Sequence, residues 1–318
     1  MTTIGKKLLR FIFVILAVTA ITFLMINILP GDVSYIIGGE TATSEDIQDI
    51  RKDLGLDRHI VVRYVAWVGR VVRGDLGESF LSREPVLDAI LRRLPVTLEL
   101  LIISQLLALL LALPAGIISA YRTNSFVDRL ISIGGFATIS IPSFVMALMT
   151  IYLFSIQLRW LPATGYTPFF EGPWANIKSF LLPALSIALI EWVVLMRVLR
   201  SDMITTLQQN YILMAKAKGL PPWKVLIRHA LRPSSLTLIT VFGIQIGRLL
   251  GEAVIVETIF ALPGIGRLLI DAIYARDYLI IQGCILLITI GYVTINSVVD
   301  VLYMVLDPRI RRETPNAG

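Results

Sequence analysis

The sequence predicts an all-α integral membrane protein with six transmembrane helices. Of its 318 residues 56% are hydrophobic and 16% are charged, whereas an ordinary soluble domain carries about 25% charged residues. A helix needs about 20 apolar residues to cross a hydrocarbon core about 30 Å thick. Six apolar runs reach that length, at approximately 10–29, 96–120, 131–155, 180–199, 236–258 and 279–305.

The first run follows Lys6, Lys7 and Arg10, which is also the arrangement of a secretory signal peptide. At 19 residues, the segment FIFVILAVTAITFLMINIL is longer than the usual apolar region of about 7–15 residues. Its small residues Ala17 and Ala20 lie inside the run and not after it. We therefore expect residues 1–29 to form a cytoplasmic N-terminus and a permanent first span.

The distribution of Lys and Arg predicts the orientation, because short cytoplasmic loops carry an excess of basic residues. With the N-terminus inside, the inner segments hold 15 Lys and Arg, of which seven lie in 197–235. The two short outer loops hold four. Both termini, including a tail at 306–318, are therefore predicted to be cytoplasmic. Arg92 and Arg93 on the outside carry little weight, because long loops cross largely regardless of charge.

The outer loop, residues 30–95, is predicted to form a small helical subdomain. Thr43 to Asp46 reads TSED, which fits a capping box, and Gly55 is placed to end the helix that it begins. A second helix is expected from about 58 to 73, with valines on one face and Gly74 at its end. The subdomain is either a lid on its own spans or a contact surface for a partner or solute.

Several kinds of chemistry are missing from the sequence. It has no G-x-x-x-x-G-K-[ST] phosphate loop, so this chain is not expected to bind ATP in that way. His59 and His229 are the only histidines and fall on opposite predicted sides of the membrane, so no metal site is expected. The only cysteine, Cys284, is expected to be a packing residue. We expect no enzyme active site, no cofactor in this chain and no nucleic-acid partner.

Residues 200–235 lie between two spans on the predicted cytoplasmic side. Nothing from Met203 to Ala217 breaks a helix, Gly219, Pro221 and Pro222 then force a turn, and a second helix can start at Trp223. A basic segment of this kind can be held by anionic lipid. Lipid attraction does not require a Gly-Pro-Pro corner flanked by small alanines, so the sequence favours a surface for docking a partner.

Charged and polar residues inside the predicted spans form a second candidate site. Arg248 and Glu252 are four residues apart and so share one helical face, as do Asn296 and Asp300. Glu191 lies in the fourth span. A lone charge at the bilayer centre costs about 2.5–3.5 kcal/mol, so these residues must face a partner, water or each other. They either fix packing, within the chain or against another subunit, or line a translocation path.

Seven stretches of the chain can be compared with known sequences. They are YILMAKAKGLPPWKVLIRHALRP (211–233), LPGD (29–32), LGLD (54–57), GDLGESF (74–80), RLPVTLEL (93–100), ETIFALPGIGRLLIDAIYARDY (257–278) and NSVVDVLYMVLDPRIRR (296–312). Together they resemble the first of the two permease subunits of bacterial ABC importers of the dipeptide/oligopeptide/nickel family, and the resemblance covers nearly the whole chain. The segment 211–233 is similar to the EAA motif of the cytoplasmic coupling loop in that family. Met214 replaces the glutamate that names the motif, a variant that indicates the peptide-type branch.

The resemblance implies a type I ABC importer permease, with a five-helix core at 96–305 in the bacterial cytoplasmic membrane. It implies a second permease, two ATPase subunits that bind ATP and Mg, and an extracytoplasmic solute-binding protein, which by analogy docks near the outer segment 259–278. The helix before the conserved glycine would seat in a groove of an ATPase. Carried onto this sequence, the coupling residues are Tyr211, Ala215, Ala217, Lys218, Gly219, Leu220, Pro221 and Pro222.

Two other function classes fit less well. An ion-coupled secondary transporter is expected to show repeated halves with broken helices, and no such repeat is seen. A membrane-embedded enzyme needs a cluster of titratable groups, which is missing. The cargo implied by the resemblance is a dipeptide or short oligopeptide, with nickel or glutathione-like solutes as the alternative.

Overall fold

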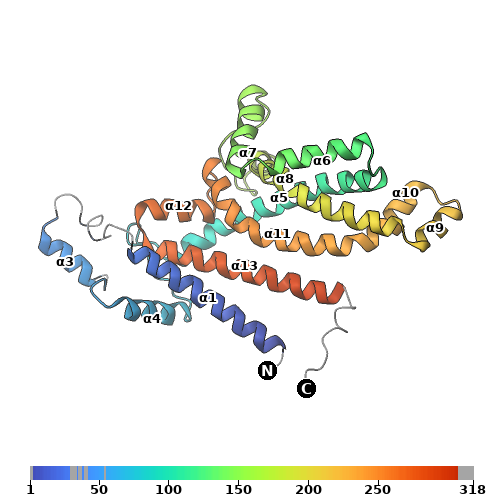
Figure 1. Cartoon of the computed structure of the whole chain (residues 1–318). Coiled ribbons are helices and arrows are strands. Elements are labelled where there is room, and N and C mark those ends of the chain that lie inside the picture. The colour runs from blue at the N-terminus through green and yellow to red at the C-terminus, as the bar shows by residue number, and fades with distance from the viewer. Residues whose placement is uncertain (1–2, 29–33, 35–37, 39–41, 54, 307–318) are drawn as a thin grey trace, which may run out of the picture. The chain divides into compact units, whose positions relative to one another are not determined.

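The computed structural model describes residues 3–28, 34, 38, 42–53 and 55–306. Within them the chain is built of helices joined by short connections (Figure 1). Contacts divide it into two compact units. The first takes in the chain up to Thr97 together with Pro263–Gly291, and the second takes in Leu98–Leu262 together with the chain from Tyr292.

The first unit contains α1 (Thr3–Ile28), α3 (Ser44–Asp53), α4 (Ile60–Val71), α12 (Ile265–Ala275) and the starts of α5 (Val86–Tyr121) and α13 (Tyr278–Leu306). The capping box predicted at Thr43 is confirmed. The Thr43 hydroxyl donates to Oδ2 of Asp46 at 2.7 Å and accepts from the Asp46 amide at 3.3 Å. The hydrogen bonds that the hydroxyl and the amide of Thr43 donate to the Asp46 carboxylate lower its pKa.

The helix ends of the outer loop also lie close to the predicted positions. Gly55 and Gly74 both have a positive φ, 63° and 82°, which only glycine adopts without strain. The amide that follows each glycine reaches back to the preceding helix, from Leu56 to the Arg51 carbonyl at 2.8 Å and from Asp75 to the Arg70 carbonyl at 3.1 Å. This is the hydrogen-bond pattern with which helices commonly stop.

The short helix predicted in 259–278 is confirmed as α12, and it packs within the first unit. The Ile265 amide donates to the Thr97 hydroxyl at 2.9 Å, and the Ser79 hydroxyl donates to the buried carboxylate of Asp277. The sequence placed 263–291 with the five-helix core, whereas these contacts join it to residues 76–97. The predicted boundary at residue 95 also lies inside α5, which begins at Val86.

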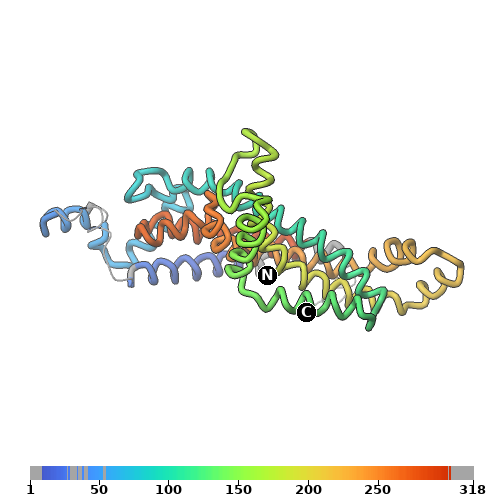
Figure 2. Tube along the Cα trace, turned by 90° about the horizontal axis from the view of Figure 1, so that it is seen from above, coloured from blue at the N-terminus to red at the C-terminus, as the bar shows by residue number. Residues whose placement is uncertain are grey.

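The second unit is built around α8 (Pro173–Leu207), which lies beside α11 (Arg232–Ile259) (Figures 1 and 2). In the most apolar 18-residue window of α8, 67% of the residues are buried, against 22–39% in the other single-helix candidate spans. The unit also contains the rest of α5, α6 (Phe126–Ile139), α7 (Ser143–Thr150), η1 (Ile151–Gln157), α9 (Asn210–Ala217), α10 (Pro222–Lys224) and η2 (Val225–Leu231).

Among the described residues, five helical segments are long and apolar enough to cross a membrane as single spans, counting α10, η2 and α11 as one, and the third predicted span, 131–155, is broken. Residues 126–157 form two helical segments that meet at 105°. Pro142 is the first residue before α7 and has an extended ψ of 146°, and proline disfavours a helical conformation in the residue before it. The sixth crossing is therefore present only if this bent pair counts as one span.

Candidate functional site

The turn between α8 and α11 is sharper than predicted. The sequence predicted an unbroken helix from Met203 to Ala217, which is wrong, because α8 ends at Leu207 and α9 begins at Asn210. The break lets α9 bury Ile212 and Ala215 against the core of its own unit. Burial of these two side chains favours the break over the continuous helix.

The face of α9 next to this buried pair is exposed and carries apolar side chains. Tyr211, Met214 and Lys218 lie at helical spacing on this face, and the side chains of Tyr211 and Met214 are 47% and 62% exposed. Trp223, just beyond the turn, is 67% exposed. Large exposed apolar side chains clustered on one surface are typical of an interaction site. We call Tyr211, Met214, Lys218 and Trp223 the knob.

Gly219 sets the shape of the turn. Its φ is 73°, and its amide donates to the Lys216 carbonyl at 2.9 Å. A Cβ placed on Gly219 would meet no atom of the described residues within 4 Å. Pro221 is extended, with a ψ of 145°, and Pro222 occupies the first turn of α10, where a missing amide hydrogen leaves no bond unmade. The corner is therefore rigid and open around Gly219.

The eight predicted coupling residues do not all face outward. Ala215 is 7% exposed and packs inside the unit, and Leu220 is half-buried against the same cluster. The remaining six are exposed: Tyr211, Ala217, Lys218, Gly219, Pro221 and Pro222. Met214 and Trp223 were not among the predicted coupling residues. Met214 could have been predicted, because it lies three residues after Tyr211 and four before Lys218 and therefore shares a helical face with them.

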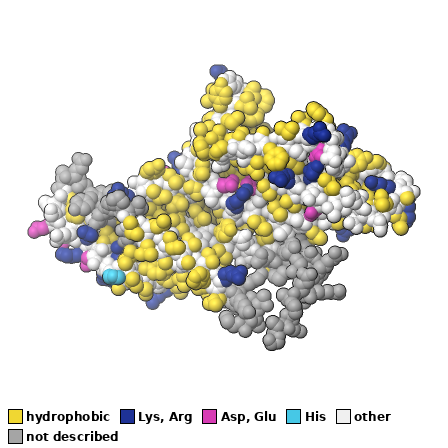
Figure 3. Space-filling view, viewed as in Figure 1, with side chains coloured by type: hydrophobic (Ala, Val, Ile, Leu, Met, Phe, Trp, Pro, Cys, Tyr) yellow, Lys and Arg dark blue, Asp and Glu magenta, His cyan; other side chains and the backbone are white. Residues whose placement is uncertain are grey.

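Basic residues surround the knob. Figure 3 shows hydrophobic side chains over most of the visible face of the described residues, with Lys and Arg gathered towards the end of the second unit that carries α6, α9 and α10. The hydrophobic cover fits a lipid-facing surface, and the basic end fits the predicted cytoplasmic side.

Arg248 joins two of the predicted intramembrane carboxylates. Its Nη2 donates to Oε1 of Glu191, and its Nε lies 3.7 Å from Oε1 of Glu252. The side chain of Glu191 is 1% exposed and that of Arg248 54% exposed. We call Glu191, Arg248 and Glu252 the charged trio. The charged trio links α8 to α11, and Arg248 is exposed at the surface of the chain.

The other two predicted polar residues occupy α13. Asn296 donates from Nδ2 to the Tyr292 carbonyl at 2.9 Å, and the same amide lies over Gly247, the neighbour of Arg248 in α11. The side chain of Asp300 lies outside the described residues. Asn296 therefore packs close to the helix that carries the charged trio but makes no hydrogen bond to it among the described contacts.

A second ion pair went unnoticed in the sequence. Arg200 of α8 donates from Nε to Oδ1 and from Nη2 to Oδ2 of Asp128, at 2.8 and 2.7 Å. The Ser119 hydroxyl, from the end of α5, also donates to Asp128, and the Asn124 amide does so at 2.8 Å. A two-pronged Arg–carboxylate pair is rigid. The sequence carries no local signal for this pair, because Asp128 lies just before the third predicted span and Arg200 follows it by 72 residues.

Two families of known transport proteins match the chain along most of its length. Residues 112–312 match the family described as binding-protein-dependent transport system inner membrane component. The chain belongs to this family. Residues 2–101 match the family described as the N-terminal part of the membrane component of the same systems. As a member of this family, the chain is a membrane-embedded transport permease subunit.

Relatives match it over nearly their full length. The chain is 39% identical over 306 residues to a Brucella abortus (strain 2308) protein named provisionally as a peptide transport system permease, covering 96% of this chain and 98% of the relative. It is 37% identical over 308 residues to a Sinorhizobium fredii protein named provisionally as a peptide ABC transporter permease, with coverage of 96% and 98%. It is also 37% identical over 306 residues to the glutathione transport system permease of Escherichia coli (strain K12), with coverage of 96% and 97%.

Proposed function

We propose that this permease forms half of the translocation path of an ATP-driven importer for dipeptides or short oligopeptides. It works with a second permease, two ATPase subunits that bind ATP and Mg, and an extracytoplasmic solute-binding protein. Both of its termini lie in the cytoplasm. The single observation that carries the coupling part of the proposal is the exposed, rigid turn at Gly219, flanked by the knob.

The turn has the properties that a docking element needs. It is a fixed corner, so it can transmit force, and its apolar tips can be buried in a groove of the partner. Lys216, Lys218 and Lys224 surround it with positive charge, which guides docking onto an acidic rim. Closure of two ATPases around ATP would then move the turns of two permeases together and switch the path between two openings.

The names of relatives support the choice of cargo. The Brucella and Sinorhizobium relatives are named for peptide transport and the Escherichia coli relative for glutathione transport, at 37–39% identity. Glutathione is itself a tripeptide, so the second candidate cargo is glutathione or a similar solute. Nickel chelates remain the third candidate, from the resemblance of the sequence to the wider family.

Replacing Gly219 tests the docking role. Gly219→Trp is expected to leave the importer in the membrane and to abolish peptide-stimulated ATP hydrolysis and uptake, because the indole would occupy open space where the partner approaches. Gly219→Ala is the matched control. It carries the same strain of about 1 kcal/mol at a positive φ but little bulk, so most of the transport activity is expected to remain.

The measurement is uptake of a labelled dipeptide into proteoliposomes that hold the complete importer, together with ATP hydrolysis. Equal loss in both variants would assign the defect to backbone strain and contradict docking at the turn. Unchanged uptake in Gly219→Trp would also contradict it. Labelled glutathione in the same assay decides the cargo, since uptake of glutathione without uptake of the dipeptide would favour the second candidate.

A further inference from the structure

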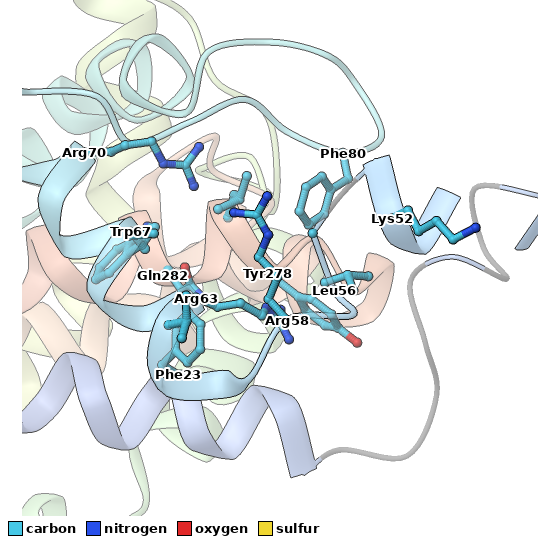
Figure 4. A pocket seen from close by; sticks show the side chains of 14 residues that line it. Phe23, Lys52, Leu56, Arg58, Arg63, Trp67, Arg70, Phe80, Tyr278 and Gln282 are labelled. Atoms are coloured by element: carbon cyan, nitrogen blue, oxygen red, sulfur yellow. The ribbon is translucent and has the colours of Figure 1, made fainter. Parts of the chain in front are cut away.

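A hollow of about 470 Å³ opens within the first unit and has no role in the proposed transport cycle. Figure 4 shows the side chains that line it, which come from α1, from the end of α3 and the connection that follows it, from α4, from the connection between α4 and α5, and from the start of α13. Phe23 of α1 and Leu279 of α13 lie at the ends of two candidate spans, both on the predicted outer side.

The charged side chains that line the hollow are all positive. Four basic side chains contribute to its lining, and neither Asp nor Glu is among the 14 lining residues. Lys52 also lies 3.4 Å from Asp49, and the Arg63 guanidinium stacks over the Phe23 ring at 5.6 Å. Arg58 and Arg70 are exposed at its edges. Four cations around one concave surface repel one another, and a bound anion relieves that repulsion.

Two buried polar groups also face this hollow. Trp67 is 3% exposed and Gln282 is 5% exposed, and both line it. Nε1 of Trp67 and Oε1 of Gln282 have no hydrogen-bond partner in the part of the chain that the structure describes. A buried donor and a buried acceptor left unpaired are costly, so a ligand that supplies an oxygen and a hydroxyl would satisfy both.

Apolar surface continues from the hollow towards the membrane. Val62, Phe23 and Leu279 form part of its wall. Val61 and Val65 on α4 and Val72 directly after it are well exposed, although they are apolar. A helix with one basic and one apolar face is typical of a segment that lies in the headgroup region of a bilayer. The site therefore offers positive charge, hydrogen-bonding groups and an apolar wall together.

We propose that this hollow binds the headgroup of an anionic phospholipid such as phosphatidylglycerol. Arg58, Arg63 and Arg70 hold the phosphate, and Trp67 and Gln282 bond the polar atoms next to it. The acyl chains lie along the apolar faces of α1 and α4. Free inorganic phosphate shares the charge of this ligand but has nothing to place against the apolar wall. Basic sites beside transmembrane helices bind anionic headgroups in the same manner.

The double variant Arg58→Gln with Arg70→Gln tests the proposal in the complete importer. Native mass spectrometry would count phosphatidylglycerol and phosphatidylethanolamine molecules retained after equal exchange. Each basic residue near an anionic lipid contributes about a factor of five in affinity, so the double change is expected to weaken retention of phosphatidylglycerol by about 30-fold. Retention of phosphatidylethanolamine is expected not to change.

Two further variants serve as a second test and as a control. Val62→Glu adds a negative charge to the wall and removes no hydrogen bond, so it is expected to expel phosphatidylglycerol as well. Arg73→Gln removes a nearby exposed charge that does not line the hollow and is expected to have no effect. Equal retention in all variants would overturn the proposal. It would also fail if inorganic phosphate alone displaced the lipid at the concentration of added lipid, because the acyl chains would then contribute nothing.

Discussion

Arg248 is the residue on which the charged trio depends. It lies between a fully buried carboxylate, Glu191, and a partly exposed one, Glu252. The buried partner cannot be left alone, because breaking a buried ion pair typically costs about 3–5 kcal/mol. The carboxylate nearer the surface has water or a second subunit available and depends less on Arg248.

We therefore predict a strong coupling between Glu191 and Arg248. Arg248→Met is expected to lower the midpoint of thermal unfolding in detergent markedly, because the Glu191 charge stays buried without a partner. Adding Glu191→Met is expected to restore most of the loss. Glu252→Leu alone is expected to be mild. The midpoints, followed by size-exclusion chromatography after heating, would contradict this if the double variant were less stable than Arg248→Met.

The sequence identified these residues better than it identified their contacts. Arg248 and Glu252 could be paired by their spacing of four, because a helix brings such residues together. Glu191 lies 57 residues earlier, and no local rule predicts which residue of α11 it meets. Asp128 and Arg200 were missed for the same reason, since the bond between them depends on the packing of α6 against α8.

At the level of helices, glycines mark where neighbours come closest. A side chain on Gly243 of α11 would overlap Val299 of α13, and one on Gly116 of α5 would lie 3.0 Å from Leu199 of α8. Gly251, also in α11, has nothing within 4 Å among the described residues. The same residue type thus has two opposite roles in a single helix.

Substituting the two glycines of α11 is predicted to have opposite effects. Gly243→Ala is expected to destabilise the chain by about 1–3 kcal/mol, because the added methyl overpacks against Val299. Gly251→Ala is expected to stabilise it by up to about 1 kcal/mol, because alanine has the higher helix propensity. Thermal unfolding of the purified chain in detergent measures both, and two shifts of the same sign would contradict the assigned packing.

A helix end can be predicted from the sequence when neighbouring residues determine it, and not when distant packing does. Thr43, Gly55 and Gly74 act through neighbours in the chain, so their roles could be predicted from sequence. The break after Leu207 is different, because it is favoured by burial of Ile212 and Ala215 against distant residues. The bend near Pro142 had a local signal, but its angle of 105° comes from the packing of α6 and α7 on α8.

At the scale of the whole molecule, the permease presents surfaces that suit an assembly. Exposed apolar residues run along α5, α6 and α11, and the knob is exposed beyond them. The apolar faces fit lipid and a second permease, and the knob fits an ATPase. Composition could predict a membrane protein, whereas which faces meet lipid and which meet protein depends on the partners.

Purification of the tagged chain from its native membrane in mild detergent tests the composition of this assembly. Native mass spectrometry is expected to find a complex with a second permease and two ATPase chains. The double substitution Met214→Glu with Trp223→Glu replaces the apolar side chains of the knob by charged ones. It is expected to release the ATPases and to keep the second permease. A homo-oligomer without ATPase, under conditions that preserve other complexes, would favour the ion-coupled alternative.

The run from Pro222 to Ile259 has a mechanical consequence. These 38 residues are helical without interruption, because the wide turn η2 accommodates Pro233. At 1.5 Å per residue, the rod extends for about 57 Å, and Arg248 lies about 39 Å from the corner at Pro222. Its companion α8 is joined to it at several points, among them the packing of α9 and the Thr206–Ser234 hydrogen bond at one end and the Glu191–Arg248 bond further along. Two rods joined at several points along their length cannot slide past each other, so a push at the corner tilts both together and carries the charged trio with them.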